Sequence, residues 1–181
     1  DKLSSYASKL DTNAGFCGDR SNLNNQSGVG TGTVITYNKG YLRVVESAPT
    51  LTCENATDYY TVASSSSGNK KLSYPIGLIT ADEAMLAGHA GGVFDGSYNH
   101  MKTNNGSYLV TGNSFWTMTP AGGYNPFGLA YWVAGVFTVG SSGRIDDPSA
   151  YNAYGLRPVV NLKSDVKITG SGTMTDPYVA S

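Results

Sequence analysis

The sequence has few charged residues: Asp, Glu, Lys and Arg make up 14% of its 181 positions, against about 25% in an average globular protein. The 12 Lys and Arg residues are balanced by 13 Asp and Glu residues. This balance argues against a protein that binds nucleic acid by following its phosphates. With 40% hydrophobic residues and a net charge of −1, the chain is not disordered by charge repulsion. No apolar run approaches the roughly 20 residues of a membrane span, so we expect no membrane contact from this segment.

Cysteine and histidine are also scarce, with two residues of each. Cys17 and Cys53 belong to no CxxC motif and have no histidine at metal-ligand spacing, which argues against a zinc site. We expect a disulfide between them, closing a loop of about 37 residues and stabilising the fold by roughly 3–4 kcal/mol. The alternative is a pair of buried thiols in a cytosolic protein, against which the low charge content argues.

Glycine (23 residues) and tyrosine (13 residues) are abundant. A composition rich in Tyr, Ser, Gly and Asn is typical of binding surfaces, and we expect a secreted protein rich in β-structure. The length suits a single domain, 1–181, with a disulfide-tied N-terminal part, 1–70, and a main core, 71–181. Because the chain begins at Asp1 without a signal peptide, we interpret it as a mature or truncated fragment that has lost a targeting segment.

The clearest predicted element is a helix over residues 80–88. Thr80 and Glu83 match a capping box, in which each side chain satisfies an otherwise unpaired backbone N–H, and Gly88 is placed to end the helix. Residues 38–40 (NKG), between TVITY and YLRVV, predict a β-hairpin over 33–45. The pattern also predicts strands at 74–79, 107–111, 114–118, 131–139 and 156–162, a short helix at 1–10 and a flexible connection over 55–71.

Several segments, in order along the chain, resemble a large family of bacterial surface proteins of unknown function, common in Gram-positive gut bacteria. The matching segments are 16–21 (FCGDRS), 50–53 (TLTC), 74–84 (YPIGLITADEA), 115–120 (FWTMTP), 154–166 (YGLRPVVNLKSDV), 170–173 (GSGT) and 176–179 (DPYV). The C-terminal segments are similar to the C-type-lectin-like fold of formylglycine-generating-enzyme-like domains and of variable proteins of diversity-generating retroelements. The resemblance implies an α+β fold with a small twisted antiparallel sheet, short helices and much irregular loop. It also implies an upstream prepilin-like or other secretion signal.

Enzymatic and metal-dependent functions find little support in the residues. His89 and His100 lie outside any nucleophile motif such as G-x-S-x-G, and we interpret both as surface-loop residues. The cysteine pair of formylglycine-generating enzymes, which holds copper, has no counterpart here. Residues 95–99 (DGSYN) only partly match a calcium loop. We therefore expect no catalytic residue, no cofactor and no metal ion, although a structural calcium remains an open alternative.

An aromatic stretch between Trp116 and Tyr154 is the most informative feature. Trp116 and Phe137 stand in apolar strand context, which favours core packing for both, and Arg157 is interpreted as tying loop carbonyls or a carboxylate in the core. Other residues of the stretch lie in loop context and form a candidate ligand face, since Tyr offers a large contact area at low entropic cost. This candidate face comprises Tyr124, Asn125, Phe127, Tyr131, Arg144, Asp146, Asp147, Tyr151 and Asn152. The alternative is that these are ordinary turn residues.

Together these observations predict a secreted or cell-surface, adhesin-like domain without catalytic activity. Its expected partner is an extracellular glycan or protein, not a nucleic acid. The competing hypothesis is a pilin-like or fibre subunit whose loops contact neighbouring subunits.

Overall fold

A computed structural model describes residues 4–23, 36–62, 71–89, 108–124, 133–173 and 175–181. Its helical elements are η1 (Ser4–Lys9), α1 (Lys39–Glu46), η2 (Ala56–Asp58) and α2 (Ala81–Leu86). Its strands are β1 (Phe16–Cys17), β2 (Thr36–Tyr37), β3 (Tyr59–Tyr60), β4 (Gly77–Leu78), β5 (Phe115–Tyr124), β6 (Val133–Val139), β7 (Ile145–Asp146), β8 (Pro158–Val159), β9 (Ile168–Thr169) and β10 (Val179–Ala180). The predicted α+β class is confirmed at this level: the fold is mixed, with a curled antiparallel sheet and few helices.

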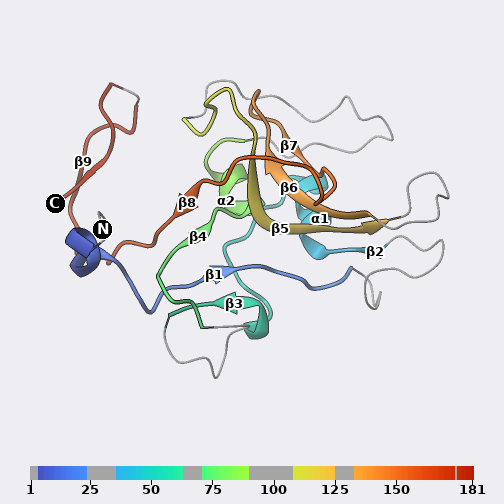
Figure 1. Ribbon diagram of the computed structural model, residues 1–181, viewed down its shortest axis with the longest axis horizontal. Helices are drawn as coiled ribbons and strands as arrows, with labels where there is room; N and C mark the ends of the chain where they lie inside the picture. Colours follow the sequence, from blue (N-terminus) through green and yellow to red (C-terminus); the bar gives the residue numbers. More distant parts are fainter. Residues whose placement is uncertain (1–3, 24–35, 63–70, 90–107, 125–132, 174) are drawn as a thin grey trace.

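The centre of the fold is a four-stranded antiparallel sheet with the order β2-β5-β6-β7. Figure 1 shows that β5 bends sharply partway along its length. The pairing of β5 with β6 shifts register on both sides of Pro120, as expected for a proline that cannot donate to the ladder. Beyond the bend, Gly122 has a φ of +151°, and a Cβ there would lie 2.4 Å from the carbonyl oxygen of Thr36. Only glycine therefore allows β2 to approach this closely.

The hydrophobic core lies between the sheet and helices α1 and α2, which pack behind β5 and β6 in the view of Figure 1. Phe115 and Phe137 are buried in it, together with Val44 from α1 and Ala84 from α2. The prediction for Phe137 is thus confirmed. Trp116 points to the opposite face of β5 and is only half-buried, so its assignment to the core was wrong. Successive side chains of a strand point to opposite faces, and the core-facing aromatic residue is its neighbour Phe115.

Two buried threonines of β5 bond to neighbouring elements, Thr117 to β6 and Thr119 to α2. The Thr117 hydroxyl donates to the carbonyl oxygen of Phe137 at 2.8 Å, and the Thr119 hydroxyl accepts from the backbone N–H of Ala81 at 2.9 Å. Ala81 is the first residue of α2, so Thr119 satisfies a backbone donor that has no partner within the helix. The Thr119 bond thereby ties the start of α2 to the middle of β5.

The prediction for α2 is confirmed, because Thr80 and Glu83 form both bonds of the capping box and Gly88 adopts a φ of +98° just after the helix. The predicted hairpin is wrong for its described residues 36–45: residues 36–37 are strand β2, but the predicted second strand is absent. Residues 39–46 form α1 instead, which buries Gly40 and Val44. A Cβ on Gly40 would lie 2.6 Å from the Thr119 side chain. Packing of this small residue on β5 therefore overrides the β-propensity of YLRVV.

Several other predicted elements are shorter than expected or absent. The strand predicted at 107–111 is wrong for the described residues 108–111: residues 108 and 109 lie in a turn, and residues 110 and 111 have no regular secondary structure. Residues 56–60 form η2 and β3 rather than a flexible connection, while the Ser-rich residues 64–67 lie outside the described part. Of 74–79 and 156–162, only β4 and β8 are strands, and they pair with each other. Leu156 and Leu162 are exposed, so the second segment is not a buried strand.

The two ends of the chain lie together at the left of Figure 1. Leu10 forms an isolated bridge with Leu162, and the Lys9 ammonium donates to the carbonyl oxygen of Ala180 at 2.8 Å. The β9–β10 hairpin therefore packs beside η1, while its own apolar side chains Ile168 and Val179 stay exposed.

Candidate functional site

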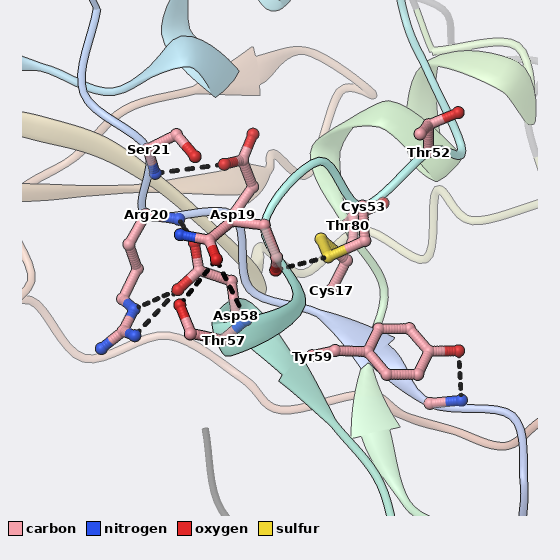
Figure 2. The surroundings of a disulfide bond; sticks show 12 residues. Cys17, Asp19, Arg20, Ser21, Thr52, Cys53, Thr57, Asp58, Tyr59 and Thr80 are labelled. Carbon is pink, nitrogen blue, oxygen red and sulfur yellow. Dashed lines mark hydrogen bonds and ion pairs between the residues drawn. A yellow bond between two sulfur atoms is a disulfide. The ribbon is translucent and has the colours of Figure 1, made fainter. Parts of the chain in front are cut away.

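The predicted disulfide between Cys17 and Cys53 is confirmed (Figure 2). It joins β1 to the loop that follows α1, with a Cα–Cα distance of 5.6 Å. A second tie lies close to it: the buried carboxylate of Asp58 accepts from the backbone N–H and the guanidinium of Arg20, both at 2.8 Å. The N-terminal segment is thus anchored at two neighbouring points.

A buried ion cluster lies beside the disulfide, along a small polar cavity of about 110 Å³. Arg43 of α1 binds Asp19 through Nη1 at 2.7 Å and Asp82 of α2 through Nε at 2.6 Å and Nη2 at 3.0 Å. Asp82 also accepts from the backbone N–H of Thr50 at 3.1 Å. One guanidinium therefore holds together three segments that are distant in sequence.

Burial and hydrogen bonding oppose each other in this cluster. Burial alone would raise the pKa of Asp19, but hydrogen bonds from Arg43 and Ser21 outweigh it and leave the pKa below its ordinary value of 3.8. Burial would likewise lower the pKa of Arg43, yet its bonds to Asp82 and Asp19 raise it. The lowered pKa of Asp19 and the raised pKa of Arg43 both favour the charged forms of these two groups, which suits a structural tie rather than proton transfer.

A pH-dependent stability follows from Asp19. Because its pKa is lowered by folding, its contribution to stability is present above about pH 3.8 and is lost as the pH falls toward the folded-state value. Asp147 affects stability in the opposite direction. Because burial raises its pKa, its contribution to stability increases as the pH falls. Urea unfolding at pH 5 and at about pH 2.5 should show an acid loss of stability that Asp19→Asn makes smaller and Asp147→Asn makes larger. An unchanged acid loss in Asp19→Asn would contradict this assignment.

The predicted ligand face is only partly within the described residues. Asn125, Phe127 and Tyr131 lie outside them. The backbone of Tyr124 ends β5 and pairs with Val133. Tyr151 and Asn152 are exposed in a turn, Tyr151 to 78%.

The segment from β7 onward connects these residues along the edge of the sheet. Residues 145–150 run antiparallel to β6, from the pairing of Ile145 with Val139 to a hydrogen bond of 2.7 Å from Ala150 N–H to the carbonyl oxygen of Ala134. Ala134 also pairs with Gly123, the neighbour of Tyr124. Tyr151, which follows Ala150, therefore lies near the level of Tyr124 along the sheet. The predicted residues therefore follow one edge of the sheet but do not converge on one point.

The charged members of the predicted face are paired or partly buried. Arg144 and Asp146 lie at the other end of β6 and form an ion pair at 2.5 Å. The carboxyl group of Asp147 is partly buried, and this burial raises its pKa.

An open hollow of about 550 Å³ lies at the start of β5, and its lining was missed by the sequence analysis. Three segments form it: residues 112–114, Ser141 of the β6–β7 turn, and residues 153–155. The first two are joined by a hydrogen bond of 3.1 Å from Ser141 N–H to the Ser114 hydroxyl.

One aromatic pair supports this hollow. The ring of Tyr154 meets the half-buried Trp116 edge to face, with centroids 5.0 Å apart and an interplanar angle of 81°. Tyr154 itself keeps 38% exposure. Tyr154 closes the aromatic stretch that the sequence indicated, but its contact with Trp116 depends on the pairing of two segments that are distant in sequence, through the bond from Trp116 N–H to the Gly155 carbonyl.

His89 does not lie in a surface loop, as we had predicted, because it is fully buried after α2. Its Nδ1 lies 2.9 Å from the carbonyl oxygen of Gly143, which ties the end of α2 to the β6–β7 turn. His100 and the calcium-like residues 95–99 lie outside the described part. Within the described ranges, no group of three or more His, Cys, Asp or Glu side chains is placed to hold a metal ion.

The structural interpretation of Arg157 agrees with the geometry. Its Nη1 donates to the carbonyl oxygen of Leu109 at 2.5 Å, and the guanidinium lies 4.8 Å from the ring centroid of Phe115. Arg157 therefore fixes residues 108–109 against the start of β5, next to the hollow.

Comparisons with known proteins yield no relative: no family model, no curated protein and no solved structure matches the chain. Among the helices of the described residues, none has the length and apolar character to cross a membrane. Function therefore has to be argued from the chemistry of the surface itself.

Proposed function

We propose that the protein is a secreted or cell-surface ligand-binding domain of adhesin-like type, without catalytic activity, built on a C-type-lectin-like variant of the α+β fold. Its partner is an extracellular glycan or protein. The binding face is the edge of the sheet from the hollow at the start of β5, along residues 145–152, to Tyr124. The sequence-predicted residues Asn125, Phe127 and Tyr131 remain part of the proposal.

The observation that carries this proposal is a pair of exposed tyrosines on one segment: Tyr154 lines the open hollow, and Tyr151 precedes it by three residues. Tyr151 and Tyr154 expose large amphipathic side chains on a segment that is hydrogen-bonded to the sheet at Ala150 and Gly155. Rigidly held Tyr side chains supply contact area at low entropic cost, and interface hot spots are enriched in them. The disulfide supports an extracellular location, because such bonds persist in oxidising compartments.

A matched pair of tyrosine variants tests the proposed face. Arrays of glycans and extracellular proteins first identify a ligand of the unmodified protein. We expect Tyr151→Ala to weaken its binding about tenfold or more, while stability changes by less than roughly 0.5 kcal/mol because the side chain is exposed. Tyr178→Ala, at a 66% exposed position beside the β9–β10 hairpin, should bind normally. Unaltered binding by Tyr151→Ala would contradict the proposed face.

A second candidate function is a pilin-like or fibre subunit, and the exposed C-terminal hairpin favours it. Ile168, Tyr178 and Val179 present apolar surface there. An apolar groove of about 270 Å³ lies close by, between η1 and residues 74–76. Neighbouring subunits could cover this surface. A loss of binding or of self-association in Tyr178→Ala, but not in Tyr151→Ala, would favour this second function.

A further inference from the structure

We propose that the hollow at the start of β5 binds one ring of an uncharged saccharide, stacked against Tyr154. This inference rests on the proposed function and names the class of its ligand. It also moves the centre of binding to residues 112–114, Ser141 and 153–155, outside the face predicted from the sequence.

The lining of the hollow combines one aromatic ring with small neutral polar groups. Asn113, Ser114 and Ser141 supply an amide and two hydroxyls, and the remaining lining positions are Gly or Ala apart from Tyr154. The Asn113 amide forms no hydrogen bond with any described part of the chain, so it is available to a ligand. An amide and a hydroxyl can each donate and accept, which matches the hydroxyl groups of a sugar.

Tyr154 is held in a fixed orientation. Trp116 supports its ring edge to face, and the backbone on either side is fixed by hydrogen bonds from Trp116 N–H to the Gly155 carbonyl at 3.0 Å and from Gly155 N–H to the Ser114 carbonyl at 3.1 Å. The face of an aromatic ring carries partial negative charge. It therefore attracts the polarised C–H groups of a pyranose ring, which form a flat apolar patch.

The absence of charge from the lining favours a neutral sugar. The charged groups on the adjoining β6–β7 turn, Arg144 and Asp146, are paired with each other at 2.5 Å. An acidic sugar needs an arginine or lysine partner to offset its desolvation, and no described lining residue supplies one.

The same geometry argues against a peptide at this place. The backbone groups at the start of β5 are occupied, because Phe115 bridges Gly155, so an added strand finds no free partner there. The lining contains one aromatic ring but no enclosed apolar slot of the kind that anchors a peptide side chain.

Tryptophan fluorescence tests the inference directly. The chain has two tryptophans, so a Trp132→Phe background leaves Trp116, next to Tyr154, as the only reporter. In this background we titrate neutral tetrasaccharides of glucose, galactose, mannose and N-acetylglucosamine, with tetragalacturonate as the acidic comparison. We expect at least one neutral tetrasaccharide to change the Trp116 emission in a saturable way, and tetragalacturonate to bind at least tenfold more weakly.

Variants in the same background give the decisive comparison. Tyr154→Ala should weaken binding at least tenfold, whereas Tyr154→Phe, which keeps the ring, should stay within about threefold. Tyr6→Ala, at an exposed position in η1, should match the background protein. Unfolding curves check that each variant is folded. If Tyr154→Ala does not fold, Tyr154→Phe still provides a test.

The outcomes separate this inference from the proposed function. No binding of any neutral tetrasaccharide, stronger binding of tetragalacturonate, or binding unaffected by both Tyr154 variants would overturn the inference. If binding of an array ligand is still weakened by Tyr151→Ala, the proposed function stands without the saccharide inference. If no array ligand binds either, both fail.

Discussion

Replacing Arg43 by methionine should destabilise the fold by about 3–5 kcal/mol. The guanidinium is the shared partner of the buried carboxylates of Asp19 and Asp82, so its loss leaves two buried negative charges close together. Urea unfolding at pH 7 measures the effect. The variant should also lose part of its native near-UV circular dichroism at moderate temperature if its remaining stability is small.

Two further variants show whether charge is the cause. Arg144→Met removes a guanidinium from a half-exposed ion pair with Asp146 and should cost less than about 1 kcal/mol. Adding Asp19→Asn and Asp82→Asn to Arg43→Met should restore part of the stability, because the buried groups then carry no charge. A loss below about 1 kcal/mol in Arg43→Met would show that the cluster is not a major tie.

Removing the disulfide should cost roughly 3–4 kcal/mol in the chain-entropy account, since the bond joins residues 36 positions apart. The Cys17→Ser, Cys53→Ser protein should unfold at correspondingly lower urea, and reductant should move the unmodified protein toward the same midpoint. Reductant should leave the serine protein unchanged, which is the control. Alkylation of both cysteines in the native, unreduced protein, seen by intact mass, would refute the bond in solution.

The local sequence was sufficient to predict α2, because its capping box and terminal glycine act within one helical turn. It was insufficient for α1, where the segment YLRVV has strong β-propensity. There the outcome depends on Gly40 meeting Thr119 and on Val44 reaching the core, contacts between segments that are distant in sequence. The one-position error at Trp116 has a related cause, since two adjacent aromatics of one strand face opposite sides and the pattern alone did not decide which faced the helices.

The candidate site was also predicted only in part, because much of it depends on contacts between segments that are distant in sequence. Tyr151 and Asn152 are exposed, as composition and turn context indicated. The hollow was missed because it forms where residues 112–114, 141 and 153–155 meet, three segments that are distant in sequence. Similarly, Arg43 lies 24 residues from Asp19 and 39 from Asp82 in sequence, so no short sequence motif predicts this ion cluster.

Hydrogen exchange with and without the tightest array ligand tests most directly whether the edge of the sheet is the binding face. Backbone amides become protected where a ligand covers them or rigidifies their segment. Our account predicts added protection in residues 108–114, 139–144 and 150–156, with little change at the two chain ends. Added protection confined to residues 4–12, 162–173 and 175–181 would contradict it and would place the contact surface at the β9–β10 hairpin instead.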